Sequence, residues 1–346
     1  MKKSGILFFV LFVFVIGSII SCKNATTQPT QPSQPSKNTV TLRLVISTTP
    51  DDYNAVETRA MGERFSERTG GEYNIQVYTS DTLMKVNEYI DAVRTGTVEM
   101  ADAGWGIYGG ADPRLNVVET PFLFNNMNAI SSCRESFRQL IDPVFQEKFN
   151  QKALSCYAIG GFELISKEPV KTLEDWQGLM VGCMSPALSS LAQALGGAPI
   201  VVMWPDLYSS LEKGVIEATL IPPIGALAGK LPDVAHNATI FYGSSPVMGY
   251  TINLDIWKAM SKSTQNILLE EVNKTADILN EAAFQQYEEH INMLKSAGVD
   301  VYALPKEERE LWKEKCEPFV DEQISNAGDF GQKIKDMADK ANAEYQ

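Results

Sequence analysis

Residues 179–220 read LMVGCMSPALSSLAQALGGAPIVVMWPDLYSSLEKGVIEATL, and this stretch decides the fold class. Its apolar runs predict three strands, over residues 179–184, 200–203 and 215–220. The segments between them, 186–195 and 206–213, have helical composition, and each is followed by glycine, a frequent stop at the end of a helix. Strands that alternate with helices in this order are typical of a parallel α/β sheet.

The same plan is found nearer the N-terminus. Alternating apolar residues predict a strand over 40–46, and Asp51 or Asp52 can cap a helix that stops at residues 70–71. A strand around residue 76, a helix that ends at Gly96 and a strand over 98–103 follow. The segment 96–100 (GTVEM) resembles 214–218 (GVIEA). The similarity could arise by chance, because the turns of any βα unit favour glycine. Two similar α/β lobes are the simplest interpretation.

A long helical pattern covers residues 263–297, with apolar residues at helical spacing. A single helix of about 33 residues would span roughly 50 Å and could run across both lobes. Two helices with a break between them explain the pattern nearly as well. Gly298 ends the pattern, residues 299–303 predict a short strand, and the charged segment from Glu307 onward predicts further helix.

The N-terminus has the features of an export signal. Lys2 and Lys3 precede an apolar run over 6–20, and the sequence Ile19-Ile20-Ser21-Cys22 follows. The run is shorter than the ~20 residues that a membrane-spanning helix needs. We interpret residues 1–21 as a signal peptide and Cys22 as the site of lipid attachment. A signal peptide with an incidental cysteine is the alternative.

Residues 22–39 predict an extended tether. The pairs Gln28-Pro29, Gln31-Pro32 and Gln34-Pro35 recur every three residues, and no large aliphatic side chain lies between Lys23 and Thr39 that could form a core. At ~3.1 Å per residue the segment reaches roughly 50 Å. The sequence therefore predicts a globular body on the periplasmic face of a bacterial membrane, attached through its N-terminal lipid only.

The charge and the cysteines restrict the possible partners. The chain has a formal net charge of −13 and no basic run, so nucleic-acid binding is disfavoured. Cys133, Cys156, Cys183 and Cys316 form no CxxC pair. An exported protein could oxidise two of them, but buried free thiols are the state that we expect.

Signatures of catalysis are missing from the sequence. There are two histidines, no Gly-x-Ser-x-Gly elbow and no Cys/His cluster for zinc. Residues 225–231 (GALAGKL) have too few residues between the glycines for a phosphate loop, and Leu231 stands where a hydroxyl side chain is required. We expect neither an enzyme nor a cofactor or metal.

Aromatic and apolar side chains follow several predicted strands: Trp105, Tyr108, Phe162, Met184 and Trp204. Ligands of open α/β sheets bind at the carboxyl ends of strands, so these residues together predict a cleft. Packing in the core is the alternative for each aromatic residue taken alone.

Several motifs occur in an order that resembles the extracytoplasmic solute receptors of TRAP (tripartite ATP-independent periplasmic) transporters. They are AVRTGTVEM at 92–100, ETPFLF at 119–124, KTLEDWQGL at 171–179, LGGAP at 195–199 and DLYSSLEKGVIE at 206–217. The resemblance covers residue 40 to about residue 319. It implies a two-lobed α/β fold of the periplasmic-binding-protein type, with a long connecting helix, a ligand cleft between the lobes and delivery of the solute to the membrane permease subunits.

The chain departs from that family at three polar anchors. Gly182 stands where the family has the arginine that holds a ligand carboxylate, Glu163 replaces the arginine of a Gly-Phe-Arg motif, and Ile221 replaces an asparagine. These changes resemble the branch of receptors that associate with a periplasmic tetratricopeptide-repeat protein. Arg59, Arg94 or Arg114 could instead supply the missing cation from another element.

We therefore expect a receptor for a relatively apolar or uncharged small molecule. A scaffold or partner-binding lipoprotein of the same fold, without a transported ligand, is the alternative. The predicted ligand-binding residues are Trp105, Tyr108, Phe162, Glu163, Gly182, Met184, Met203, Trp204 and Ile221. The predicted lobes are 40–162 with about 246–287, and 163–245 with about 288–346.

Overall fold

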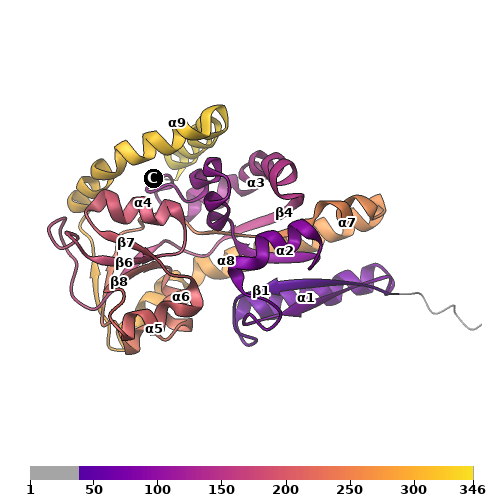
Figure 1. Ribbon diagram of the computed structural model, residues 1–346, viewed down its shortest axis with the longest axis horizontal. Coiled ribbons are helices and arrows are strands. Elements are labelled where there is room, and N and C mark those ends of the chain that lie inside the picture. Colours follow the sequence, from indigo (N-terminus) through magenta and orange to yellow (C-terminus); the bar gives the residue numbers. More distant parts are fainter. Residues whose placement is uncertain (1–38, 346) are drawn as a thin grey trace, which may run out of the picture. The chain divides into compact units, whose positions relative to one another are not determined.

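The computed structural model describes residues 39–345, so the predicted signal peptide, Cys22 and nearly all of the tether lie outside the described residues. The described part holds two β-sheets, and helices pack against each of them (Figure 1). We call the first sheet with its helices lobe I and the second sheet with its helices lobe II. The predicted α/β class with two lobes is confirmed.

The α-helices are α1 (Tyr53–Arg68), α2 (Tyr89–Thr95), α3 (Met127–Phe149), α4 (Pro186–Leu195), α5 (Leu207–Glu212), α6 (Pro223–Ala228), α7 (Leu254–Ala259), α8 (Lys262–Ser296) and α9 (Lys306–Glu344). Short 3-10 helices are η1 (Val86–Glu88), η2 (Trp105–Gly110), η3 (Pro113–Glu119), η4 (Trp204–Asp206) and η5 (Leu231–Asp233). Helix α4 has the bounds that the sequence predicts, because Ser185 caps its first turn and Gly196 ends it with a left-handed backbone.

The sheet of lobe I has the strand order β2 (Tyr73–Tyr78), β1 (Val40–Ile46), β3 (Met100–Gly104), β10 (Val247–Asn253) and β4 (Gln151–Ala158). Strands β2, β1 and β3 are parallel, as expected. Strand β10 is antiparallel to both β3 and β4. The expected parallel pairing therefore holds for the three predicted strands, but the whole sheet is mixed, because β10 arrives from the other lobe and not through a local helix.

The sheet of lobe II has the order β11 (Asp300–Ala303), β9 (Asn237–Ile240), β5 (Glu163–Ser166), β8 (Ala218–Ile221), β6 (Met180–Cys183) and β7 (Ala198–Val201). Strands β8, β6 and β7 are parallel and come from the stretch with which the sequence analysis began. Strand β5 is antiparallel to its neighbours β8 and β9. Both sheets are thus mixed.

The chain crosses between the lobes at residues 159–162 and again at 241–246. These two segments are joined by backbone hydrogen bonds. The amide of Phe162 donates to the carbonyl of Ser244 (2.9 Å), and the amide of Gly243 donates to the carbonyl of Phe162 (3.1 Å). Paired crossover segments of this kind are the natural position for a hinge.

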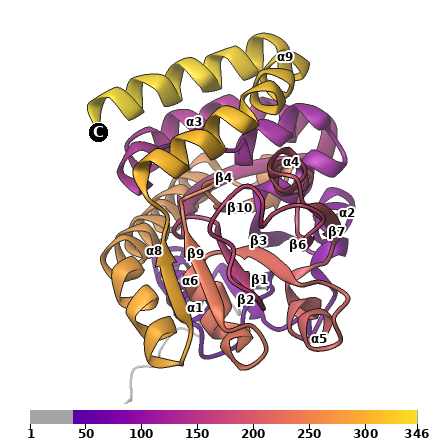
Figure 2. The same ribbon diagram turned by 90° about the vertical axis from the view of Figure 1, so that its left-hand side faces the viewer.

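Helix α8 is one continuous helix and not two. Its N-terminal half packs into the core of lobe I through Leu268, Val272 and Leu279, and Leu294 near its end belongs to a core cluster of lobe II. Helix α9 also contacts both lobes: Trp312 packs in lobe II and Ile334 in lobe I, on either side of a kink at Gly328. Figure 2 shows α9 running over α3.

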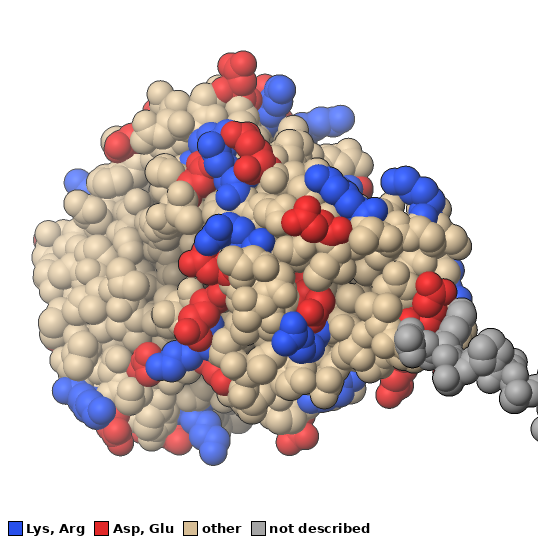
Figure 3. Space-filling view, turned by 45° about the vertical axis from the view of Figure 1, so that its right-hand side comes forward, with Lys and Arg blue, Asp and Glu red and all other residues tan. Residues whose placement is uncertain are grey.

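The four cysteines of the described part are buried and free. No helix within residues 39–345 is both long and apolar enough to cross a bilayer. Acidic and basic side chains are interspersed over the face in Figure 3, without a patch of one sign.

Candidate functional site

A cavity of about 180 Å³, open to solvent, is lined by residues of both lobes. Lobe I contributes the segments that follow β1 and β3, and lobe II contributes those that follow β6, β7 and β8. The carboxyl ends of parallel strands from both sheets therefore meet at one cavity, which is where open α/β sheets bind their ligands.

The wall from lobe II is apolar. Met184 follows β6, Met203 and Trp204 follow β7, and Ile221 ends β8. Phe162 from the first crossover segment, with 4% of its surface exposed, completes this wall. Five of the predicted ligand-binding residues are therefore brought together around one space, although they are up to 59 positions apart in the sequence.

The wall from lobe I carries most of the polar groups of the cavity, together with apolar residues such as Ile107 and Met248. Thr48 and Thr49 follow β1, and the Asp52 side chain caps α1 by accepting from the amide of Asn54 at 2.9 Å. Burial raises the pKa of Asp52, and backbone hydrogen bonds oppose this rise. Behind this wall, the Asn54 amide group donates to Asp102 Oδ2 at 3.0 Å. Burial raises the pKa of Asp102 to about 6.

Glu119 lies at the end of η3 and lines the cavity with only 5% of its surface exposed. Ser185 Oγ donates to its Oε2 at 2.6 Å, which joins the two lobes at this point. Burial raises the pKa of Glu119 to about 7, and the hydrogen bond from Ser185 opposes this rise. The carboxyl group packs directly over Gly106, where an added Cβ would lie 2.1 Å from Oε2.

Trp105 and Tyr108 do not line the cavity. Both are buried in the core of lobe I, where Tyr108 stacks on Phe145 with 4.3 Å between ring centroids. The Tyr108 hydroxyl donates to Gln151 Oε1 at 2.6 Å, and the Trp105 ring lies against the backbone of Gly249. The alternative of core packing therefore holds for these two aromatic residues, because η2 turns them away from the strand ends.

Gly182 lies within β6, and it does not line the cavity either. A Cβ added there would lie 2.6 Å from Ile216 Cδ1 and 3.3 Å from Leu207 Cδ2. The space that a larger side chain needs close to the backbone is thus filled by apolar neighbours.

Glu163 is fully buried at the start of β5 and faces the second crossover segment, not the cavity. Its Oε2 accepts from the amides of Phe241 (2.6 Å) and Tyr242 (3.0 Å), and its Oε1 accepts from the hydroxyl of Tyr287 on α8. Burial raises the pKa of Glu163 to about 7, while these donors and the charge of Arg309 oppose the rise. The expectation that Glu163 faces the ligand was wrong: it ties β5 to the crossover segment and to α8.

The three arginines that could replace the missing anchor are engaged elsewhere. Arg59 donates to the carbonyl of Pro50, Arg94 pairs with Asp91, and Arg114 pairs with Asp112. No Lys, Arg or His is found among the described residues that line the cavity.

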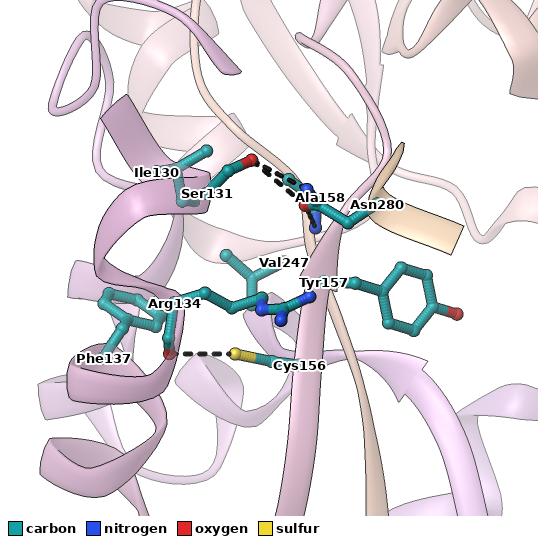
Figure 4. Close-up of a pocket in the computed structure, with 9 residues that line it drawn as sticks. All are labelled: Ile130, Ser131, Arg134, Phe137, Cys156, Tyr157, Ala158, Val247 and Asn280. Atoms are coloured by element: carbon teal, nitrogen blue, oxygen red, sulfur yellow. Dashed lines mark hydrogen bonds between the residues drawn. The ribbon is translucent and has the colours of Figure 1, made fainter. Parts of the chain in front are cut away.

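A second, much smaller cavity of about 10 Å³ lies between α3 and β4 (Figure 4). Asn280 of α8 reaches it and exchanges hydrogen bonds with Ser131, while Cys156 Sγ donates to the carbonyl of Arg134. Arg134 pairs with Asp277 of α8. These contacts fasten α8 to lobe I, so we assign this cavity a structural role.

Sequence reasoning missed the polar part of the large cavity. Glu119 and Asp52 were recognised only as part of a motif and as a helix cap, and Ser185 was not singled out. The signal in the sequence is the position of Ser185 directly after a predicted strand, and that of Asp52 shortly after β1.

Comparison with known proteins agrees with the geometry. The family model for bacterial extracellular solute-binding proteins, family 7, matches residues 45–326. The C4-dicarboxylate-binding periplasmic protein DctP of Rhodobacter capsulatus is 26% identical over 82% of this chain and 86% of its own length. The ectoine-binding periplasmic protein TeaA of Halomonas elongata is 21% identical over 77% of this chain and 80% of its own.

Among solved structures, a TRAP periplasmic solute binding protein from Desulfovibrio salexigens with bound orotic acid has a TM-score of 0.82 at 20% identity. The match covers 88% of this chain and 99% of that one. The chain therefore belongs to family 7 of the bacterial extracellular solute-binding proteins, and it shares the fold of that TRAP periplasmic solute binding protein.

Proposed function

We propose that this receptor binds a relatively apolar or uncharged, amphipathic small molecule and delivers it to the membrane permease subunits of its transporter. The observation that carries the proposal is the cavity, which has an apolar wall from lobe II and no lining Lys, Arg or His among the described residues. A buried carboxylate without a cationic partner costs several kcal/mol, whereas apolar area stabilises binding by about 25 cal/mol per Å².

The residues at the three family anchors support this proposal. Ile216 and Leu207 fill the space next to Gly182, Glu163 is bound to the crossover segment, and Ile221 adds an apolar side chain to the wall. Phe162, Met184, Met203, Trp204 and Ile221 are the residues that we propose to contact the ligand body.

We also propose that Cys22 carries the lipid that holds the receptor at the periplasmic face of the membrane, with residues 22–39 as the tether. A periplasmic tetratricopeptide-repeat lipoprotein remains our proposal for an additional partner. The lipid site rests on the sequence alone, because residues 1–38 lie outside the described part. The partner rests on the departures from the family at Glu163, Gly182 and Ile221.

Calorimetry against succinate, malate and sialic acid tests the ligand class. We expect no micromolar binding of any of the three, and tight binding of one of them would overturn the proposal. Native mass spectrometry of the purified receptor should in turn detect a co-purified solute with an apolar body. A receptor that never carries or binds a small molecule would favour the scaffold alternative.

A further inference from the structure

The lining of the cavity is unbalanced in charge. Its described residues include the carboxyl groups of Asp52 and Glu119 and no Lys, Arg or His to neutralise them. The remaining polar side-chain groups of the lining are the hydroxyls of Ser47, Thr48, Thr49 and Ser185, the amide of Asn54 and the indole N–H of Trp204. An anionic ligand would meet two carboxyl groups here, and a purely apolar ligand would bury them without a cation beside them.

Glu119 is the better placed of the two carboxyl groups. It is 95% buried, and within residues 39–345 its carboxyl group accepts one hydrogen bond, from Ser185 to Oε2. Its other oxygen, Oε1, receives none. An ionised carboxylate can accept about four hydrogen bonds, so capacity remains for a donor that enters the cavity.

The Glu119 carboxyl group occupies the space that a side chain at position 106 would fill. Any side chain at Gly106 would overlap it, since an added Cβ would lie 2.1 Å from the carboxyl carbon. The carbonyl of Glu119 is held as well, because Ser244 Oγ of the second crossover segment donates to it at 2.8 Å. Glu119 thus contacts Gly106 of lobe I, Ser185 directly before α4 and Ser244 of the second crossover segment.

We propose that the physiological ligand is an amphipathic amine, whose protonated nitrogen donates to Glu119 and whose apolar body lies against Met184, Met203, Trp204 and Ile221. This inference rests on the proposed function and specifies the amphipathic ligand that it allows. The ammonium group supplies the positive charge and the donors that the lining lacks, and hydrogen bonds between charged partners are about twice as strong as neutral ones. Asp52, the second carboxyl group of the lining, adds to the attraction.

Three probes with the same eight-carbon chain test this inference: octylamine, octanol and octanoate. Calorimetry on the full receptor at pH 7.5 should give at least about tenfold tighter binding for octylamine than for octanol, a difference of about 1.4 kcal/mol. Octanoate should bind more weakly than both. In the Glu119→Gln variant the preference for the amine over the alcohol should fall to within about threefold, because the charged acceptor is gone.

Glu174→Gln is the matched control, since Glu174 is an exposed carboxylate that does not line the cavity. It should keep the preference for the amine. The comparison of the three probes needs only the unmodified protein, so it stands even if Glu119→Gln fails to fold.

The outcomes separate this inference from the proposed function. Equal binding of octylamine and octanol, stronger binding of octanol, or no binding of the amine would overturn the amine inference and leave an apolar ligand possible. If octanoate bound most tightly of the three probes, both the amine inference and the proposed function would be overturned. Unchanged amine preference in Glu119→Gln would overturn the role of Glu119.

Discussion

Replacement of Glu163 by alanine should destabilise the protein without any effect on ligand charge preference. The side chain is fully buried and accepts from the amides of Phe241 and Tyr242 and from the hydroxyl of Tyr287. Each buried amide that loses its acceptor costs about 1–3 kcal/mol. The variant also avoids burying an ionisable carboxyl group, which offsets part of this loss. We expect a net decrease of about 2–4 kcal/mol in the free energy of unfolding, on the order set by loss of a buried hydrogen-bond network.

Urea denaturation at pH 7, followed by tryptophan fluorescence, measures this change. Glu168→Ala is the matched control, because Glu168 is an exposed glutamate two residues beyond β5, and surface changes usually stay within about 0.5 kcal/mol. Glu163→Gln keeps an acceptor for the amides, so its free energy of unfolding should decrease clearly less than that of Glu163→Ala. If Glu163→Ala and Glu168→Ala differ by less than about 1 kcal/mol, the crossover segment does not depend on this carboxyl group. A gain of succinate binding in Glu163→Ala would show that the side chain does act on the ligand.

Four further outcomes are expected. First, the pKa of Glu119 is raised to about 7 from the usual 4.5, so the destabilisation that its ionisation causes is absent below pH 4.5, grows between pH 4.5 and 7, and is complete above pH 7. Glu119→Gln should therefore remove up to about 3 kcal/mol of the stability lost between pH 5 and pH 8, and an unchanged pH profile from denaturation at both pH values would contradict this. Second, Gly182→Arg should lose about 1–3 kcal/mol from overpacking against Ile216, without gaining succinate binding in calorimetry. Third, Cys22→Ala should abolish labelling by a radioactive fatty acid, and a labelled variant would refute the lipid site. Fourth, small-angle scattering should show a smaller radius of gyration once the co-purified solute is bound, and an unchanged radius would count against closure of the lobes.

Local sequence patterns predicted most of the elements that carry the cavity. Glycines after helical segments and short apolar runs placed α4 and the parallel strands β6, β7 and β8 close to their observed positions. The strands β4, β5, β9 and β10 were not predicted, and all four pair antiparallel across long sequence distances. Such pairing depends on a partner strand far away in the chain, which no local window contains.

The sequence by itself determined the α/β class, the alternation of strands and helices and the absence of an arginine at Gly182, because these depend on residue type and local spacing. Only the tertiary structure decided which way the side chains face. It buried Glu163 at the crossover segments, turned Trp105 and Tyr108 into the core of lobe I, and brought Glu119 to the cavity beside Ser185. The physical reason is that a side chain's surroundings are set by the packing of the two lobes and of the segments that cross between them. These contacts join residues that are 66 to 124 positions apart.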